Sequence, residues 1–320
     1  MEYVSVKGMD QRLSRISLGT MRIVSKSVDE NGNKIYTGKP VEEVETLIKA
    51  AVDMGINLID TADIYGHGVS EELIGKVLAK NPGLREKIVL QTKCGVVSTD
   101  DEKNYNVSKE YILKCVDESL ERLQTDYIDI LLLHKPDPLY DPVGIGEAFE
   151  ELYENGKVRN FGLSNFTSLQ TAVIQKYCSR PVAFNQLQFS ITHSQMIDAE
   201  INVNTYSEYA VERDTALLDY CRLNDIRMEA YSVVQGENGS FINNPDYAKL
   251  NQVMEKLCEK YHTNKNAVAI AWILKHPAGI IPTVGTTKVE HLKDSLEALD
   301  FELTRQEWYD LYLATEKPLP

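Results

Sequence analysis

Short runs of apolar residues alternate along the chain with longer segments whose apolar residues recur at helical spacing. The runs are Ile16–Leu18, Asn57–Asp60, Ile88–Lys93, Ile128–His134, Asn160–Ser164, Ala183–Gln188, Arg227–Tyr231 and Gly279–Val284. The segments between them are Val41–Met54, Glu71–Leu78, Ser108–Leu123, Ile145–Asn155, Ser168–Tyr177, Arg213–Leu223, Tyr247–Lys275 and Val289–Leu299. The first set is typical of buried strands and the second of amphipathic helices, with Tyr247–Lys275 long enough for two.

This alternation predicts an α/β fold. Near-continuous apolar strands separated by helices indicate a parallel sheet covered by helices. Eight such units favour a closed (β/α)8 barrel, a TIM barrel, over an open sheet. Met1–Val6 is predicted to add a strand or hairpin before the barrel, and Thr304–Ala314 an extra C-terminal helix. Because no linker or low-complexity tract divides the chain, we expect residues 1–320 to form a single domain.

The longest irregular stretches each follow a predicted strand. They are Val96–Val107, Pro136–Gly144, Ile191–Glu212 and Val233–Asp246. In a barrel, loops in these positions gather at the C-terminal face, where barrel enzymes carry their chemistry.

Composition narrows the possible partners. The 320 residues include 34 Lys and Arg against 48 Asp and Glu, which gives a net charge of −14. This acidic balance argues against nucleic acid, because neutralising phosphates requires an excess of Lys and Arg, and against an anionic membrane surface. We therefore expect a small-molecule partner. Nothing in the pattern predicts an oligomeric state.

The five cysteines are widely and irregularly spaced, without a CxxC pair. This spacing indicates neither a disulfide framework nor a zinc ribbon, and the six histidines show no metal-ligand spacing. The first residues are too polar for a signal peptide, and no apolar run reaches the roughly 18 residues of a membrane-spanning helix. The sequence predicts a soluble cytoplasmic protein without a bound metal.

Polar residues stand at the last positions of the predicted strands. They are Asp60, Lys93, His134, Ser164 with Asn165, Gln186 with Gln188, and Tyr231 with Ser232. One such residue alone is readily explained as a helix cap. Several from different strands would instead converge in the mouth of a barrel, and an unpaired buried ammonium is costly.

Tyr65 follows Asp60 by five residues, on the loop that leads to the second helix. A tyrosine has a reference pKa near 10 and is a poor acid at neutral pH unless it is perturbed. A neighbouring Lys93 is predicted to lower that pKa, and Asp60 to keep the ammonium charged and in place. A neutral His134 could hold the oxygen of a substrate carbonyl.

These residues lie in motifs that resemble the aldo-keto reductases, over almost the whole chain. DTADIYG resembles the family's Asp and Tyr motif, VLQTKCG its Lys motif and YIDILLLHKPD its His motif. GLSNF, NQLQFS and AYS resemble its nicotinamide-binding segments. HKPDPL and PTVGTTKVEHL are similar to a bacterial oxidoreductase branch.

The resemblance implies an NAD(P)H-dependent reduction of aldehydes or ketones. Tyr65 would donate the proton, with its pKa lowered by Lys93, which pairs with Asp60. His134 would orient the carbonyl. The hydride would come from C4 of a reduced nicotinamide stacked on Tyr231.

The resemblance also implies the cofactor contacts. Thr20 and Met21 would line the nicotinamide side, and Asp60 is a further cofactor contact. Ser164, Asn165 and Gln186 would bind the carboxamide. Ser232 and the loop from Val233 to Gly236, which includes Val234, would cross the pyrophosphate. Gly285, Thr286, Thr287 and Lys288 would hold the adenosine end. The N-terminus of the next helix is a further anion site. These groups imply NADPH. His291 replaces a common Arg, so NADH is a second possibility.

Two other functions and the substrate-facing residues also have to be considered. A cofactor-binding, redox-sensing regulatory subunit could share the fold, but the presence of all four catalytic positions favours the enzyme. A hydrolase is disfavoured because no nucleophile or paired carboxylates stand at strand ends. Tyr105 either reaches over the substrate or is an exposed loop aromatic, and Tyr206 and Tyr209 suggest an apolar wall suited to aromatic or aliphatic carbonyls.

Overall fold

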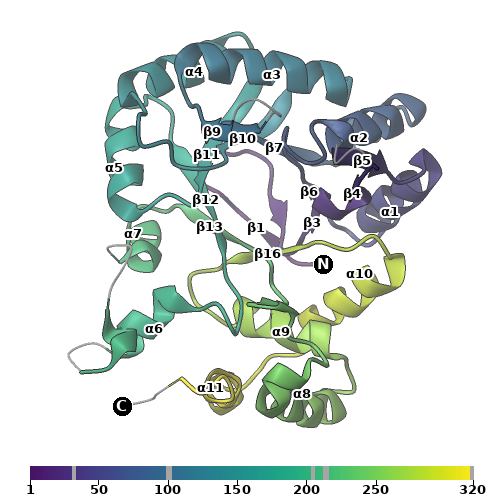
Figure 1. Cartoon of the computed structure of the whole chain (residues 1–320), viewed down its shortest axis with the longest axis vertical. Coiled ribbons are helices and arrows are strands. Elements are labelled where there is room, and N and C mark those ends of the chain that lie inside the picture. Colours follow the sequence, from purple (N-terminus) through teal and green to yellow (C-terminus); the bar gives the residue numbers. More distant parts are fainter. Residues whose placement is uncertain (31–33, 99–102, 203–205, 212–215, 318–320) are drawn as a thin grey trace.

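The structure is a computed structural model that describes residues 1–30, 34–98, 103–202, 206–211 and 216–317. Parallel strands in this part of the chain form a closed eight-stranded barrel (Figure 1). Its strands are β3 (Ser17–Gly19), β6 (Leu58–Asp60), β7 (Val89–Cys94), β10 (Ile128–Leu133), β11 (Val158–Ser164), β12 (Val182–Gln188), β13 (Arg227–Tyr231) and β16 (Ile281–Val284). They pair in chain order, and β16 closes the ring against β3. The predicted barrel is confirmed.

Helices lie between the strands and pack around the barrel (Figure 1). They are α1 (Val41–Asp53), α2 (Val69–Lys80), α3 (Lys109–Leu123), α4 (Pro142–Glu154), α5 (Ser168–Tyr177), α6 (Gln195–Ile201), α7 (Leu217–Leu223), α8 (Ala248–Tyr261), α9 (Lys265–Leu274), α10 (Val289–Leu296) and α11 (Arg305–Leu313). Short 3-10 turns are η1 (Met21–Ile23), η2 (Arg85–Lys87), η3 (Glu208–Ala210), η4 (Pro245–Tyr247) and η5 (Glu297–Leu299). The apolar sides of the helices and the outer side of the barrel form one large core.

Local capping explains where predicted and observed helices differ. Helix α4 begins at Pro142, three residues before the predicted start, because Asp141 caps its N-terminus and a proline is favoured at the first position. The segment Tyr247–Lys275 divides into α8 and α9 where His262 takes a left-handed backbone, with φ of 53°. The start of the helix predicted at residue 213 lies outside the described residues.

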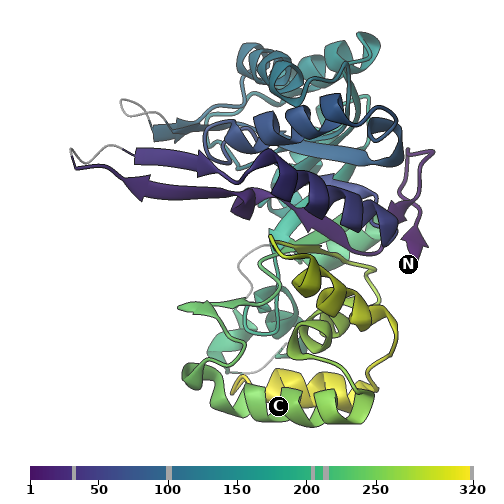
Figure 2. The same cartoon turned by 90° about the vertical axis from the view of Figure 1, so that its right-hand side faces the viewer.

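The stretches expected to be irregular contain small ordered elements. β8 (Val96–Ser98) pairs with β9 (Lys103–Tyr105), and β14 (Gln235–Gly236) pairs with β15 (Gly239–Ser240). A further hairpin, β4 (Val24–Val28) with β5 (Lys34–Gly38), was not predicted. Its strands are mostly exposed, so they lack the buried face that produces a readable apolar pattern. The hairpins β4–β5 and β8–β9 project from the same side of the molecule (Figure 2).

The N-terminal hairpin closes the opposite end of the barrel. β1 (Tyr3–Val4) pairs with β2 (Leu13–Ser14), as predicted for an additional element before the barrel. Leu13 and Val6 belong to a separate apolar cluster with inward residues of the barrel such as Leu58, Phe184 and Ile281. The bottom of the barrel is therefore apolar and sealed, which leaves the C-terminal ends of the strands for chemistry.

Candidate active site

A cavity of about 250 Å³ opens at the C-terminal ends of the strands. The predicted residues that line it are Met21, Asp60, Tyr65, His134, Ser164, Asn165, Gln186, Tyr231, Ser232, Val233, Val234 and Gly285. Four of them stand on the strands β6, β11, β12 and β13, and the others lie on the segments that follow β3, β6, β10, β11, β13 and β16. The barrel thus brings together positions that are more than 250 residues apart in the sequence.

Lys93 is the centre of a buried network behind this cavity. Its Nζ lies 2.7 Å from Oδ1 of Asp60, and the lysine is completely buried. The same Nζ donates to the carbonyl oxygen of Thr61 at 2.7 Å and to Oη of Tyr65 at 3.2 Å. The three N–H groups of the ammonium thus have three acceptors, which makes this buried charge tolerable.

The pKa of Tyr65 is not lowered as the sequence predicted. Burial raises it above its ordinary value and outweighs the lowering by Lys93, because Asp60 opposes the effect of that lysine. Tyr65 therefore holds its proton in this structure, as a proton donor must. The ammonium remains beside Oη, where it stabilises a phenolate once one forms.

His134 is neutral and faces Tyr65. Burial lowers the pKa of His134 well below its ordinary value, and the charges of Lys93 and Lys135 lower it further. The two rings meet edge to face, with centroids 5.8 Å apart and planes at 79°. A neutral imidazole can donate one hydrogen bond to a carbonyl oxygen.

The residues predicted to bind a carboxamide are already linked to one another. Oη of Tyr231 donates to Oδ1 of Asn165 at 2.8 Å, and Oγ of Ser164 donates to the carbonyl oxygen of Gln186 at 2.9 Å. The backbones of Asn165 and Ser232 are left-handed, with φ of 64° and 58°. Such values are uncommon outside glycine and often occur at functional sites.

The amide of Gln186 points into the barrel. Its Nε2 donates to Oδ1 of Asp60 at 3.1 Å and to Oε2 of Glu229 at 2.8 Å. Both hydrogens of the amide nitrogen are thus used, and Oε1 is the group that remains for a ligand. Gln186 can serve a bound molecule as an acceptor but not as a donor.

Two residues of this interior layer, Gln91 and Glu229, were not identified from the sequence. Both are buried, and Nε2 of Gln91 reaches across the barrel to Oε2 of Glu229 at 2.7 Å. The alternation of side chains along a strand could have identified them. Gln91 lies two residues before Lys93 and Glu229 two before Tyr231, so each points to the same side of its strand as that predicted site residue. A charged residue in the middle of a buried strand could have been read as an inward-facing group.

Several predicted residues lie away from the cavity. Thr20 is buried and donates to the carbonyl oxygen of Asp60, so its hydroxyl braces β6 and does not line the cavity. Tyr105 is an exposed residue of β9, and Gly236 lines a different cavity. The cavity is also lined by Gly19, Arg22, Lys135 and Thr283, which sequence reasoning missed, and by Gln235, which lies in the loop predicted to cross the pyrophosphate. Arg22 and Lys135 supply positive charge next to predicted positions in an acidic chain.

The predicted adenosine-binding segment forms the start of α10. Thr286 folds back to accept from the backbone N–H of Lys288 at 3.2 Å. Lys288 is the N-cap residue, yet its side chain makes no capping hydrogen bond. The first N–H groups of α10 therefore have no side-chain cap, and free N–H groups at the N-terminus of a helix favour an anion. His291 lies in the first turn of the same helix, next to Glu290.

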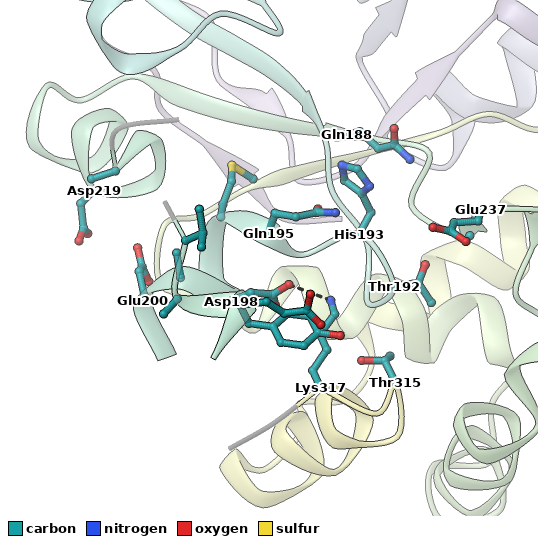
Figure 3. A pocket seen from close by; sticks show the side chains of 18 of the residues that line it. Gln188, Thr192, His193, Gln195, Asp198, Glu200, Asp219, Glu237, Thr315 and Lys317 are labelled. Atoms are coloured by element: carbon teal, nitrogen blue, oxygen red, sulfur yellow. Dashed lines mark ion pairs between the residues drawn. The ribbon is translucent and has the colours of Figure 1, made fainter. Parts of the chain in front are cut away.

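A second cavity, of about 1160 Å³, lies between α6, the β14–β15 hairpin and the C-terminal segment (Figure 3). Its lining is largely polar and includes Thr192, His193, Gln195, Glu208 and Glu237. At its base Nζ of Lys317 lies 3.2 Å from Oδ2 of Asp198 (Figure 3). None of the four predicted catalytic residues is among the described residues that line it.

A third cavity, of about 380 Å³, shares residues with both of the others. It has Asn165 and Tyr231 in common with the first cavity, and Gln188 and His193 in common with the second. The expected apolar wall is only half present, because Tyr206 is fully exposed while Tyr209 lines the second cavity. Phe166, Leu187, Met196 and Leu217 also line the third cavity, so the wall beside the candidate site combines apolar and polar groups.

The described residues contain no cluster of three or more His, Cys, Asp or Glu side chains arranged to hold a metal ion. In the same part of the chain, no helix has both the length and the apolar character needed to cross a bilayer.

Comparison with known proteins gives matches along nearly the whole chain. The model of the aldo/keto reductase family matches residues 15–312. Oxidoreductase YcsN of Bacillus subtilis is 36% identical over 282 residues, covering 86% of this chain and 88% of that protein. A 6-dehydroglucose reductase of Agrobacterium fabrum is 33% identical over 306 residues, covering 94% and 93%. The solved structure of a glycerol dehydrogenase from Gluconobacter oxydans superposes with a TM-score of 0.79 at 26% identity, covering 99% and 97%.

Proposed function

Because the chain belongs to the aldo/keto reductase family, whose members are oxidoreductases of carbonyls and alcohols, we propose that it reduces aldehydes or ketones with NADPH. One observation carries this proposal. A protonated Tyr65 lies within 3.2 Å of a buried Lys93 ammonium and beside a neutral His134, at the mouth of the barrel. That arrangement suits the transfer of one proton to a carbonyl oxygen.

Each residue has a separate task in the proposed reaction. Tyr65 gives its Oη proton to the carbonyl oxygen and later regains one from solvent. Lys93 stabilises the phenolate that remains on Tyr65, and Asp60 holds that ammonium in position at 2.7 Å. His134 donates a hydrogen bond to the carbonyl oxygen and orients it. The hydride that reaches the carbonyl carbon is the chemistry that a reduced nicotinamide supplies.

The described residues fit such a cofactor. Oε1 of Gln186 is available to accept a hydrogen bond from the carboxamide, and the ring of Tyr231 offers a stacking surface in the same cavity. A Cβ at Gly285 would meet no atom within 4 Å, so the chain leaves open space there. Arg22 lines the cavity as a cation suited to the pyrophosphate, which helps an acidic protein to hold an anion.

The preference for NADPH rests on the start of α10. The uncapped N–H groups and Lys288 favour a 2′-phosphate, whereas Glu290 in the first turn opposes one. We propose that the favourable groups prevail and that NADH is a weaker substitute. Equal catalytic efficiency with NADPH and NADH would contradict this preference.

We propose a hydroxylated carbonyl as the substrate, in place of the aromatic or aliphatic compound suggested by the sequence. The third cavity shares residues with each of the other two. A substrate held at Tyr65 can therefore extend past Gln188 towards the polar cavity of Figure 3. Thr192, Gln195 and Glu237 offer hydrogen-bonding groups along that path. The similarity to a protein named 6-dehydroglucose reductase supports the same class.

The test is a panel of hydroxylated, aliphatic and aromatic aldehydes and ketones with each cofactor, followed by nicotinamide absorbance. We expect turnover with NADPH and the highest kcat/KM for hydroxylated carbonyls. Tight NADPH binding without turnover of any carbonyl would favour the regulatory alternative. A preference for aromatic aldehydes would refute the proposed substrate class but not the reaction.

We further propose that residues 1–320 form one domain and that the protein works in the cytoplasm. The large apolar core that includes residues from β3 to α11 supports the first point. All five cysteines are free thiols, which supports a reducing compartment.

A further inference from the structure

Glu229 lies in the middle of β13 with its side chain buried inside the barrel. Its Oε2 accepts hydrogen bonds from Nε2 of Gln91 at 2.7 Å and from Nε2 of Gln186 at 2.8 Å. The same two nitrogens donate to Oδ1 of Asp60, at 2.8 and 3.1 Å. Since an amide nitrogen has two hydrogens, the donor capacity of both amides is fully used, and the two NH2 groups link the two carboxyl groups.

The cluster holds two carboxyl groups but a single cation. Lys93 pairs with Asp60, and Oε1 of Glu229 is buried without a hydrogen-bond partner among the described residues, as is Oε1 of Gln91. A second buried negative charge without a cation is costly. Burial and the charge of Asp60 raise the pKa of Glu229 to about 7, although the two amides and Lys93 oppose this effect.

The surroundings of Glu229 come from four other strands. β6 contributes Asp60, β7 contributes Gln91 and Lys93, β12 contributes Gln186, and β16 contributes the apolar Ile281 beside it in register. On its own strand, Arg227 turns away and donates to the carbonyl oxygens of Ala278 and Gly279. Among these groups Asp60 and Lys93 are the charges that act on Glu229.

We infer that Glu229 is a positioning residue whose protonation sets how readily Tyr65 releases its proton, through Asp60 and Lys93. The inference rests on the proposed carbonyl reduction. While Glu229 is protonated, Lys93 and Asp60 balance each other, and the phenolate left on Tyr65 adds one negative charge to a neutral cluster. Once Glu229 is ionised, the same step adds a second uncompensated charge. Proton donation is then harder.

The expected signature is a step in the pH profile. For the wild-type protein, kcat/KM for reduction should fall several-fold as the pH rises through neutrality, because the charge of the ionised Glu229 makes Tyr65 a weaker acid. Glu229→Gln keeps the shape of the side chain but cannot ionise. Its profile should lack the step, and its final decline at high pH should begin at a lower pH than in the wild type.

The control is Glu259→Gln, which removes the same charge from the exposed surface of α8. Its profile should retain the step. An active wild type whose profile coincides with that of Glu229→Gln would overturn the inference while leaving the proposed reduction intact. Absence of carbonyl reduction by the wild type would instead refute the proposed function.

A stability measurement gives a readout that does not depend on turnover. The pKa of Glu229 is raised to about 7 in the folded protein, above the ordinary value of 4.5, so the folded state binds more protons between these values. Glu229 therefore contributes stability that is lost as the pH rises from about 4.5 to 7, and this contribution must vanish in Glu229→Gln. Parallel Tm–pH curves for the two proteins would count against the inference. If Glu229→Gln fails to fold, Glu229→Asp should shift the midpoint of the step, and an unshifted midpoint would overturn the inference.

Discussion

Nζ of Lys93 donates to Oη of Tyr65 across 3.2 Å, and it lies 4.9 Å from the centre of the tyrosine ring. The lysine comes from a barrel strand and the tyrosine from the loop after the preceding strand. Despite this contact, the pKa of Tyr65 is raised, because burial of the phenol outweighs the attraction of the ammonium. Tyr65 therefore stays protonated, and the adjacent ammonium of Lys93 would stabilise the phenolate that forms when Tyr65 loses its proton.

Replacing Tyr65 with Phe removes the hydroxyl and keeps the ring against His134. We expect kcat/KM for carbonyl reduction to fall at least about 100-fold, the usual contribution of a positioned general acid. NADPH affinity, measured by quenching of protein fluorescence, should stay within about twofold, because Oη contacts Lys93 and not the proposed cofactor contacts. Tyr206→Phe is the matched control, since that side chain is fully exposed. Full activity in Tyr65→Phe would refute its role as the acid.

Replacing Lys288 with Ala removes the exposed cation at the start of α10. If this end of the helix holds a 2′-phosphate, KM for NADPH should rise roughly tenfold, the size of one hydrogen bond to a charged group. KM for NADH should hardly change, because NADH lacks that phosphate. Lys293→Ala, in the last turn of the same helix, is the control. Equal changes in KM for NADPH and NADH would mean that Lys288 does not contact the 2′-phosphate.

Two glycines of α4 should differ in their tolerance of alanine. A Cβ at Gly146 would lie 2.2 Å from the carbonyl oxygen of Tyr177, a backbone atom that cannot yield easily. Gly146→Ala should lower the free energy of unfolding by about 1–3 kcal/mol through overpacking. At Gly144 the nearest atom is 3.3 Å away on the side chain of Asp141, which can shift more easily than a backbone atom, so Gly144→Ala should change the free energy of unfolding much less. Urea unfolding midpoints test the pair, and a stabilised Gly146→Ala would contradict the close packing of α4 on α5.

The sequence predicted the barrel and the strand-end residues of the candidate site, because both depend on local information. The alternation of apolar runs with helical segments can be recognised from consecutive residues. In a parallel barrel the C-terminal ends of the strands lie at one face irrespective of the loop conformations. Asp60, Lys93 and His134 could therefore be expected to meet. The β4–β5 hairpin could not be foreseen, since its strands bury no face against the core.

The tertiary structure decided the electrostatics of these residues. The direction of the pKa shift of Tyr65 depends on how deeply the phenol is buried and on the strength with which Asp60 offsets Lys93, and neither quantity is present in a motif. The link between Glu229 and Asp60 likewise needs two amides contributed by other strands of the barrel. Such groups are far apart in sequence and become neighbours only on closure of the barrel, when the loss of water makes each unpaired charge costly.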